Sequence, residues 1–392
     1  NTAVGRGSLD ANTTASANTA VGYNALTTNT TGTGNVGVGA SALGNNPAGS
    51  FNVAVGNGAL KQNTTANANT AIGYEALYTT NAGGSGGYNN SAVGYHALYS
   101  LTTGVQHCAV GQEALFACTT GNNNVAIGFK ALYSQTTGSN ASAVGWKALN
   151  ANTTGNNTAV GSQALLTVTT GNNNTAMGIS ALLSSTADNN TAFGHVALTA
   201  NTTGVQNVAV GAFALDANTT ADNNTALGYA SLSANTTATQ NTAVGGNSLS
   251  NATTSSYNTA VGYAALEQST TGNGRNVAVG NECLEENTTG YYNVAVGSNA
   301  LEANTTGHSN TAMGINALLV NNSNYNTAIG GFALTANTTG AYNTAVGYDS
   351  LDTNTTGDYN TAVGYNALEA NTTANNNTAV GYQALHTNTT GA

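Results

Sequence analysis

The apolar positions of this chain recur with a period of 17 residues along its whole length. Each repeat reads N-T-A-V-G-Y-x-A-L-x-x-N-T-T-G-x-x, and the distance from its first residue to the leucine is constant. The few changes in repeat length fall on the N-T-T-G side, which is therefore predicted to be a loop. The repeats form one continuous array over residues 1–392, without a separate globular domain, and begin at residues 1, 18, 35, 52, 69, 90, 107, 124, 141, 157, 174, 190, 207, 224, 241, 258, 276, 293, 310, 326, 343, 360 and 377.

Positions 2 to 4 of the repeat predict a short β-strand, because Thr, Val and Ile favour strands. Side chains alternate along a strand, so positions 2 and 4 share one face and the small residues at positions 3 and 5 share the other. Position 4 is always a large apolar residue and position 9 is always Leu. We therefore expect positions 4 and 9 to fill the core and position 5, which is always Gly, to make a turn.

These expectations name specific residues. The predicted core includes Val4, Leu9, Val21, Leu26, Val55, Leu60, Val261, Leu266, Val363 and Leu368. The predicted coil turn includes Gly5, Gly22, Gly56, Gly262 and Gly364. Position 6 tolerates Tyr, Trp, Ser, His, Gly and Arg, so it is predicted to lie outside.

A stable helix is disfavoured, because glycine and N-T-T-G leave only about two turns of uninterrupted chain per repeat. The predicted fold is an all-β parallel β-solenoid, or β-roll, of about 23 coils whose strands stack about 4.8 Å apart. A short helical turn at Y-x-A-L is an open variant. Ala at position 3 and Gly at position 5 are small enough for a second copy to approach closely, so we expect a homo-oligomer, as a trimer or as an end-to-end filament.

The charge content is low and excludes one class of partner. Of 392 residues, 5 are Lys or Arg and 15 are Asp or Glu, which gives a net charge of −10. Binding of nucleic acid needs clustered basic residues, and these are absent. No run of about 18 apolar residues predicts a membrane span, and the segment that opens with Asn1 shows no leader pattern.

Two catalytic or nucleotide-binding motifs match literally but lack their structural context. Residues 32–37 fit G-x-G-x-x-G, yet this segment joins two repeats and has no following helix. Residues 83–87 fit G-x-S-x-G, yet they belong to a four-residue insertion in a Gly-rich loop. Neither match supports an enzyme.

The residue types that most often carry chemistry are scattered. His96, His107, His195, His308 and His386 occupy five different repeat positions, and solvated histidines are expected. A threefold axis could still gather three copies of one His around a metal.

Cysteine and carboxylate chemistry is not indicated either. Cys108, Cys118 and Cys283 replace small consensus residues and are expected to be free thiols, with Cys108–Cys118 as the alternative disulfide. The calcium pattern of RTX repeats is missing. We predict a non-enzymatic protein without a cofactor or a resident metal.

The strand motif N-T/V-A-V-G resembles the S-V-A-I-G repeat in the heads of YadA-type trimeric autotransporter adhesins. The longer unit G-Y-x-A-L-x-x-N-T-T-G-x-x-N-T-A-V-G is similar to repeats of bacterial and phage tail-fibre proteins that end in an endosialidase-type chaperone domain. The resemblance spans the whole chain, although the unit is 17 residues rather than about 14 as in the adhesin heads. It implies a trimeric shaft outside the cell, at a cell surface or in a virion tail.

Two functions remain open. The first is a structural or adhesive fibre involved in surface attachment, and the second is an ice- or crystal-binding solenoid. Exposed tyrosines are predicted to contact cell-surface glycans or neighbouring fibres, or to pack between protomers; they are Tyr23, Tyr74, Tyr95, Tyr263, Tyr348, Tyr365 and Tyr382, with the pre-strand aromatics Phe51, Tyr257, Tyr292, Tyr325, Tyr342 and Tyr359. N-T-T is also a formal glycosylation motif, as at Asn29, Asn152, Asn201 and Asn337, although ladders of stacked Asn and Thr are the preferred interpretation.

Overall fold

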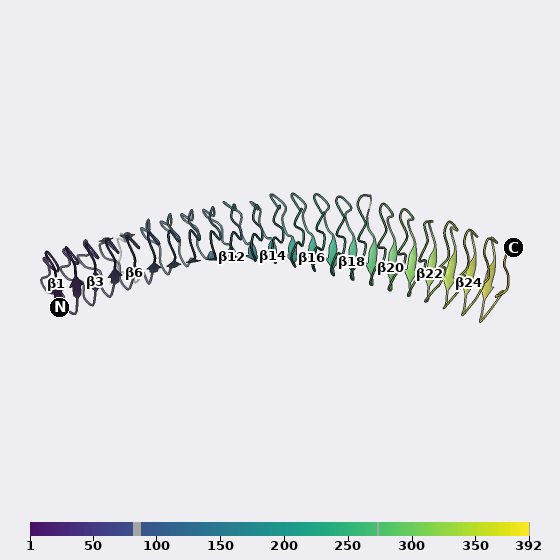
Figure 1. Ribbon diagram of the computed structural model, residues 1–392, viewed down its shortest axis with the longest axis horizontal. Helices are drawn as coiled ribbons and strands as arrows, with labels where there is room; N and C mark the ends of the chain where they lie inside the picture. The colour runs from purple at the N-terminus through teal and green to yellow at the C-terminus, as the bar shows by residue number, and fades with distance from the viewer. Residues whose placement is uncertain (81–87, 273, 392) are drawn as a thin grey trace. The chain divides into compact units, whose positions relative to one another are not determined.

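Each repeat contributes one three-residue strand, formed by its positions 2 to 4. The computed structural model describes residues 1–80, 88–272 and 274–391, in two units, Asn1–Asn190 and Thr191–Ala392. Each unit is an all-β parallel β-solenoid with 17-residue spacing, as predicted, and no helix occurs in the described residues (Figure 1). The Y-x-A-L segment forms turns, so the helical-turn variant is wrong. The G-x-S-x-G match at residues 83–87 lies outside the described residues.

Equivalent residues of successive repeats pair directly, for example Ala3 with Ala20 and Ala345 with Ala362. The main strands of the first unit are β1 (Thr2–Val4), β2 (Thr19–Val21), β3 (Val36–Val38), β4 (Val53–Val55), β6 (Thr70–Ile72), β8 (Ser91–Val93), β9 (Cys108–Val110), β10 (Val125–Ile127), β11 (Ser142–Val144), β12 (Thr158–Val160) and β13 (Thr175–Met177). A second, short pair joins β5 (Gln62–Asn63) to β7 (Thr79–Thr80). The strands of the second unit are β14 (Thr191–Phe193), β15 (Val208–Val210), β16 (Thr225–Leu227), β17 (Thr242–Val244), β18 (Thr259–Val261), β19 (Val277–Val279), β20 (Val294–Val296), β21 (Thr311–Met313), β22 (Thr327–Ile329), β23 (Thr344–Val346), β24 (Thr361–Val363) and β25 (Thr378–Val380).

The core of a coil consists of small residues and one leucine. Ala20, Ala25 and Leu26, at positions 3, 8 and 9, have no exposed surface, and the same positions are buried in most other coils. The leucine prediction is confirmed at Leu9, Leu26, Leu60, Leu266 and Leu368, all of which are buried.

The valine prediction is wrong, because position 4 points outward. Val4, Val21, Val55 and Val261 are 57%, 36%, 37% and 36% exposed, and Val363 is half-buried. The interior is too narrow for a branched residue on the inward face of the strand. At Gly37, which replaces the usual Ala of position 3, an added Cβ would already lie 3.4 Å from the side chain of Leu26. The small residues at position 3 are therefore the interior ones, and they do not form a surface for a second copy.

Two ladders of asparagine fill the rest of the interior, at positions 1 and 12. In the first ladder the Oδ1 of Asn18 accepts the backbone N–H of Asn35 at 2.9 Å. In the second, the Nδ2 of Asn63 donates to Asn46 Oδ1 at 2.8 Å and to the carbonyl of Ala66 at 3.0 Å. The predicted ladders are thus confirmed. Asn29, Asn152, Asn201 and Asn337 have no exposed surface, so the folded coil does not present these amides to a glycosylating enzyme.

The glycine turn after each strand is also confirmed. Gly5, Gly22, Gly56, Gly262 and Gly364 have φ between +125° and +145°. A Cβ on Gly22 would lie 2.5 Å from the carbonyl oxygen of the glycine in the next coil, so glycine is required both by conformation and by space.

The turn continues through left-handed residues that the sequence does not reveal. Asn24 and Leu26, at positions 7 and 9, have φ of +52° and +51°, and the same values recur in other coils. A left-handed conformation costs a leucine about 1–2 kcal/mol. Inter-coil hydrogen bonds hold it, such as that from Leu26 N–H to the carbonyl of Ala42 at 3.0 Å.

Candidate functional surface

The outward residues at positions 2 and 4 form an apolar surface on each unit, here called the outer strand face. In the first unit Ile72, Ile127 and Met177 are among its exposed residues, and in the second unit Leu227, Met313 and Ile329 are. No repeat has Asp, Glu, Lys or Arg at position 2 or 4. Exposed apolar patches of this extent are characteristic of interaction surfaces.

The parallel register makes this face regular. Val55 pairs with Ile72 and Val279 with Val296, so each outward side chain lies beside its equivalent in the next coil. Position 2 is mostly Thr or Val, both β-branched. Because such side chains have few rotamers, the face is a stiff surface of two parallel columns.

The tyrosines at position 6 are exposed, as predicted, but their ring faces are largely used within the chain. Tyr74 and Tyr95 stack with ring centroids 5.4 Å apart. Tyr348, Tyr365 and Tyr382 form a run with spacings of 5.8 and 5.5 Å. A sugar that approached such a run would meet ring edges, with open faces only at the two ends.

Other tyrosines of this column have different neighbours. The guanidinium carbon of Arg6 lies 6.0 Å from the ring centre of Tyr23. Tyr263 is exposed and lies beside the small residue Gly246 of the preceding coil.

A second aromatic column, at position 10 of the first unit, was not predicted. Tyr78, Tyr99, Phe116 and Tyr133 stack at 5.2, 5.3 and 5.2 Å. The ammonium of Lys61 lies 5.8 Å from the ring centre of Tyr78, at one end of the column. The signal in the sequence is an aromatic residue directly after the leucine in four successive repeats.

His96 and Lys130 add charge beside this column. The ring of His96 lies 3.9 Å from that of Tyr95, and its Nε2 is 3.1 Å from a carboxylate oxygen of Glu75. Lys130 pairs with Glu113 at 3.2 Å and lies 4.9 Å from the ring centre of Tyr133. The two carboxylate contacts join neighbouring coils at the surface.

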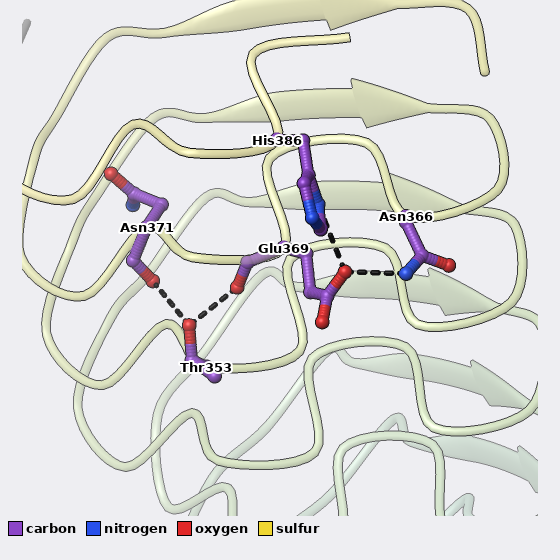
Figure 2. A network of polar contacts seen from close by, with 5 residues as sticks. All are labelled: Thr353, Asn366, Glu369, Asn371 and His386. Atoms are coloured by element: carbon purple, nitrogen blue, oxygen red, sulfur yellow. Dashed lines mark hydrogen bonds and ion pairs between the residues drawn. The ribbon is translucent and has the colours of Figure 1, made fainter. Parts of the chain in front are cut away.

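Some acidic side chains also contact residues of adjacent coils. Burial and the neighbouring carboxylates, Glu282 first among them, raise the pKa of Glu285. At the end of the second unit, Glu369 accepts from Asn366 and lies 3.0 Å from Nδ1 of His386 (Figure 2). The hydroxyl of Thr353 donates to the carbonyls of Glu369 and Asn371 in the next coil. These contacts join adjacent coils.

One histidine contradicts the expectation of solvated histidines. His107 takes the place of Asn in the position-1 ladder and is 2% exposed. Its Nε2 lies 2.7 Å from the carbonyl of Gly121, and its Nδ1 accepts the N–H of Asn124 at 3.2 Å. Burial lowers the pKa of His107 to about 4.

The three cysteines are free thiols, as expected, and the Cys108–Cys118 disulfide does not form. Cys118 replaces Asn in the position-12 ladder, with its Sγ 3.9 Å from Nε2 of His107. Burial raises the pKa of Cys118 to about 11 and that of Cys283 to about 12. Both are therefore protonated, unreactive thiols at neutral pH.

Within residues 1–80, 88–272 and 274–391, no group of three His, Cys, Asp or Glu side chains is placed to hold a metal ion. The same residues contain no helix long and apolar enough to cross a membrane. Models of known protein families give no match to the chain, and curated protein sequences give none either.

Proposed function

We propose that this chain is the non-catalytic shaft of an extracellular fibre, of the adhesin or tail-fibre type, and that copies associate through the outer strand face. The observation that supports this proposal is the uncharged apolar surface that recurs along each unit. The repeated asparagine ladders supply a stiff support for this surface.

The size of the outer strand face is sufficient for a stable complex. A side chain at position 4 that is about 40% exposed offers on the order of 50 Å². Over the strands of one unit, positions 2 and 4 together then offer on the order of 1,000 Å². A standard interface buries about 800 Å² per partner. In a trimer each copy divides its face between two neighbours, so one unit supplies on the order of 500 Å² to each neighbour and the whole chain on the order of 1,000 Å².

We propose that three copies associate, with the two columns of each face contacting different neighbours. In the threefold arrangement that we propose, the position-2 column of one copy contacts the position-4 column of the next, a head-to-tail contact of the kind that forms rings. Because neither column carries a charge, association buries no unpaired ion. The resemblance to adhesin heads favours the same number.

The first test is the mass of the full chain in solution, by light scattering coupled to size exclusion. We expect three times the 38.8 kDa chain mass. Ile127→Lys places a charge in the outer strand face and should release monomers, whereas Thr120→Lys, on an exposed loop residue of the same unit, should not. A wild-type monomer would refute the proposal, and so would equal effects of the two substitutions.

A second function is favoured by one observation, the regular spacing of Thr and Val on the outer strand face. Threonine at position 2 recurs in register, as in Thr344 and Thr361, with strands about 4.8 Å apart. Such an array suits a crystalline surface such as ice. Thermal hysteresis of the purified chain, lost in a Thr344→Lys variant, would support this alternative, and its absence in the wild type would remove it.

A further inference from the structure

Three tyrosines of the second unit form the closest run of stacked phenols among its tyrosines. Tyr325, Tyr342 and Tyr359 each precede the first residue of a repeat. Their ring centroids are 5.0 Å apart in both steps, and the interplanar angles are 11° and 3°. The three residues share φ values of 61°, 60° and 57°, so the backbone has the same conformation at each of them.

The backbone holds these rings in register. β22 pairs with β23, and β23 with β24, so that Thr327, Thr344 and Thr361 are direct neighbours. The three rings therefore follow one another in adjacent coils, each nearly parallel to the next. The three side chains are 47%, 48% and 57% exposed, which leaves them open to reagents and free to tilt.

We propose that this column is a site of oxidative cross-linking, where Tyr342 couples to Tyr325 or to Tyr359 as dityrosine. The oxidant is hydrogen peroxide acting through a peroxidase. One peroxide removes one electron and one proton from each of two phenols and leaves as two waters. The two phenoxyl radicals join through a carbon–carbon bond between ortho carbons, and each ortho hydrogen then moves to its phenol oxygen. The chain loses two hydrogen atoms per link, and adjacent coils become covalently tied.

Neighbouring groups favour this column. His308 stacks on Tyr291 at 4.7 Å and makes an edge-to-face contact with Tyr325 at 5.1 Å, so it packs against one end of the column. The run of Tyr348, Tyr365 and Tyr382 is more widely spaced, at 5.8 and 5.5 Å, so it should couple less.

The chain also contains an interrupted version of the same column. Arg275 lies between Tyr257 and Tyr292, with its guanidinium carbon 5.0 and 5.7 Å from the two ring centres. These two tyrosines are thus separated by one coil and should not couple. The cross-linking is internal to one chain and does not depend on the proposed assembly.

The test is oxidation of the full chain with peroxidase and limiting hydrogen peroxide, followed by dityrosine fluorescence, intact mass and peptide mapping. Stacked phenols have an effective concentration of millimolar or more, so at micromolar protein the 325–342 and 342–359 pairs should exceed unstacked pairs by at least about tenfold. Tyr342→Phe should remove both pairs. Tyr229→Phe is the matched control, because Tyr229 is exposed but its ring contacts Phe213.

A gain of cross-linking provides an independent check. Arg275→Tyr completes a run of phenols with Tyr257 and Tyr292, and should add cross-linked pairs that the wild type lacks. The proposal fails if cross-links follow exposure and include Tyr229 as often as Tyr342. It also fails if they scale with protein concentration, or if they survive Tyr342→Phe.

Discussion

The buried imidazole of His107 should make one coil of the first unit sensitive to acid. Only the neutral ring with its proton on Nε2 satisfies both polar contacts, donating to Gly121 and accepting from Asn124. A second proton, on Nδ1, would face the N–H of Asn124. The thiol of Cys118, whose Sγ lies 3.9 Å from Nε2 of His107, is neutral and does not compensate the charge of a protonated ring.

The direction and size of the effect follow from the pKa. Burial lowers the pKa of His107 from 6.5 to about 4. Between these values the unfolded chain binds a proton that the folded coil does not, so stability is full above about pH 6.5 and falls as the pH falls toward 4. At about 1.36 kcal/mol per pH unit the loss reaches about 3 kcal/mol.

Hydrogen exchange of the full chain, read by mass spectrometry and corrected for intrinsic rates, measures this loss locally. Between about pH 7 and pH 4, protection of the peptide that contains Asn124 should fall by about two orders of magnitude. The peptide with Asn343, whose N–H donates to Asn326 Oδ1, serves as an internal control and should keep its protection.

His107→Asn restores the consensus residue and should abolish the acid response, whereas His308→Asn, outside the core, should leave it. The reasoning is refuted if the wild type keeps its protection at pH 4, or if His107→Asn loses protection to the same extent.

Four further predictions test the packing of the coil. Gly262→Ala should destabilise the chain by about 3 kcal/mol or more, because φ is +145° there, whereas Gly246→Ala, with only ordinary contacts to Tyr263, should be nearly neutral in thermal melting. Ala143→Val should lower the unfolding free energy by about 1–3 kcal/mol, because it overpacks the interior. Val144→Ala should change the unfolding free energy of a monomer by less than about 0.5 kcal/mol, because Val144 points outward. The reverse order of the two effects in urea titrations would overturn the assigned faces. Gln135→Asn should raise the unfolding free energy by about 1 kcal/mol, because the buried Nε2 of Gln135 has no hydrogen-bond partner. An Asn there can donate to the carbonyl of Gly138, as Asn46 donates to that of Gly49. No gain in melting temperature would count against the ladder geometry. Half-buried Cys108 should react with iodoacetamide at pH 8 in the folded chain, whereas Cys118 and Cys283 should react only after unfolding, because burial raises the pKa of both thiols; peptide mapping of early labelling at Cys118 would contradict this.

Periodicity alone was enough to predict the parallel solenoid, the leucine core and the glycine turn. Position 9 never varies and position 5 is always Gly, and each has one dominant physical reason. Alternation along the strand also showed that positions 2 and 4 share a face. Alternation could not show which of the two faces points into the coil. Large apolar side chains favour burial, whereas the narrow interior accepts only small side chains.

The sequence nevertheless contains a signal for the correct face. Position 4 accepts Val, Ile, Met, Phe and Leu, a range of volumes that a narrow interior would not tolerate. Position 3 is Ala in nearly every repeat, which is the stricter limit on size. The aromatic column of Tyr78, Tyr99, Phe116 and Tyr133 needed the exact register of neighbouring coils before its rings could be seen to stack.

The interior ladders explain why chemically unusual residues gather in one stretch of the first unit. At position 12, Asn is replaced by Thr80, Leu101, Cys118 and Gln135 in successive repeats. Two of these, Thr80 and Gln135, leave a buried polar atom without a partner in the described structure. In the second unit, Asn337, Asn354 and Asn371 continue the ladder, and the Nδ2 of each later residue donates to the Oδ1 of the one before it at 2.9 Å.

An asparagine ladder is continuous only where successive coils all carry Asn, because each amide donates to the neighbour on one side and accepts from the neighbour on the other. Once one coil loses its Asn, the amides on either side lose a partner, and selection against a second replacement next to it is weaker. Substitutions should therefore cluster, and the coils that contain them should open first. The coils around His107 contain such a cluster, so a pH-dependent opening of the first unit should begin there, whereas the coils of Asn337, Asn354 and Asn371 in the second unit should open late.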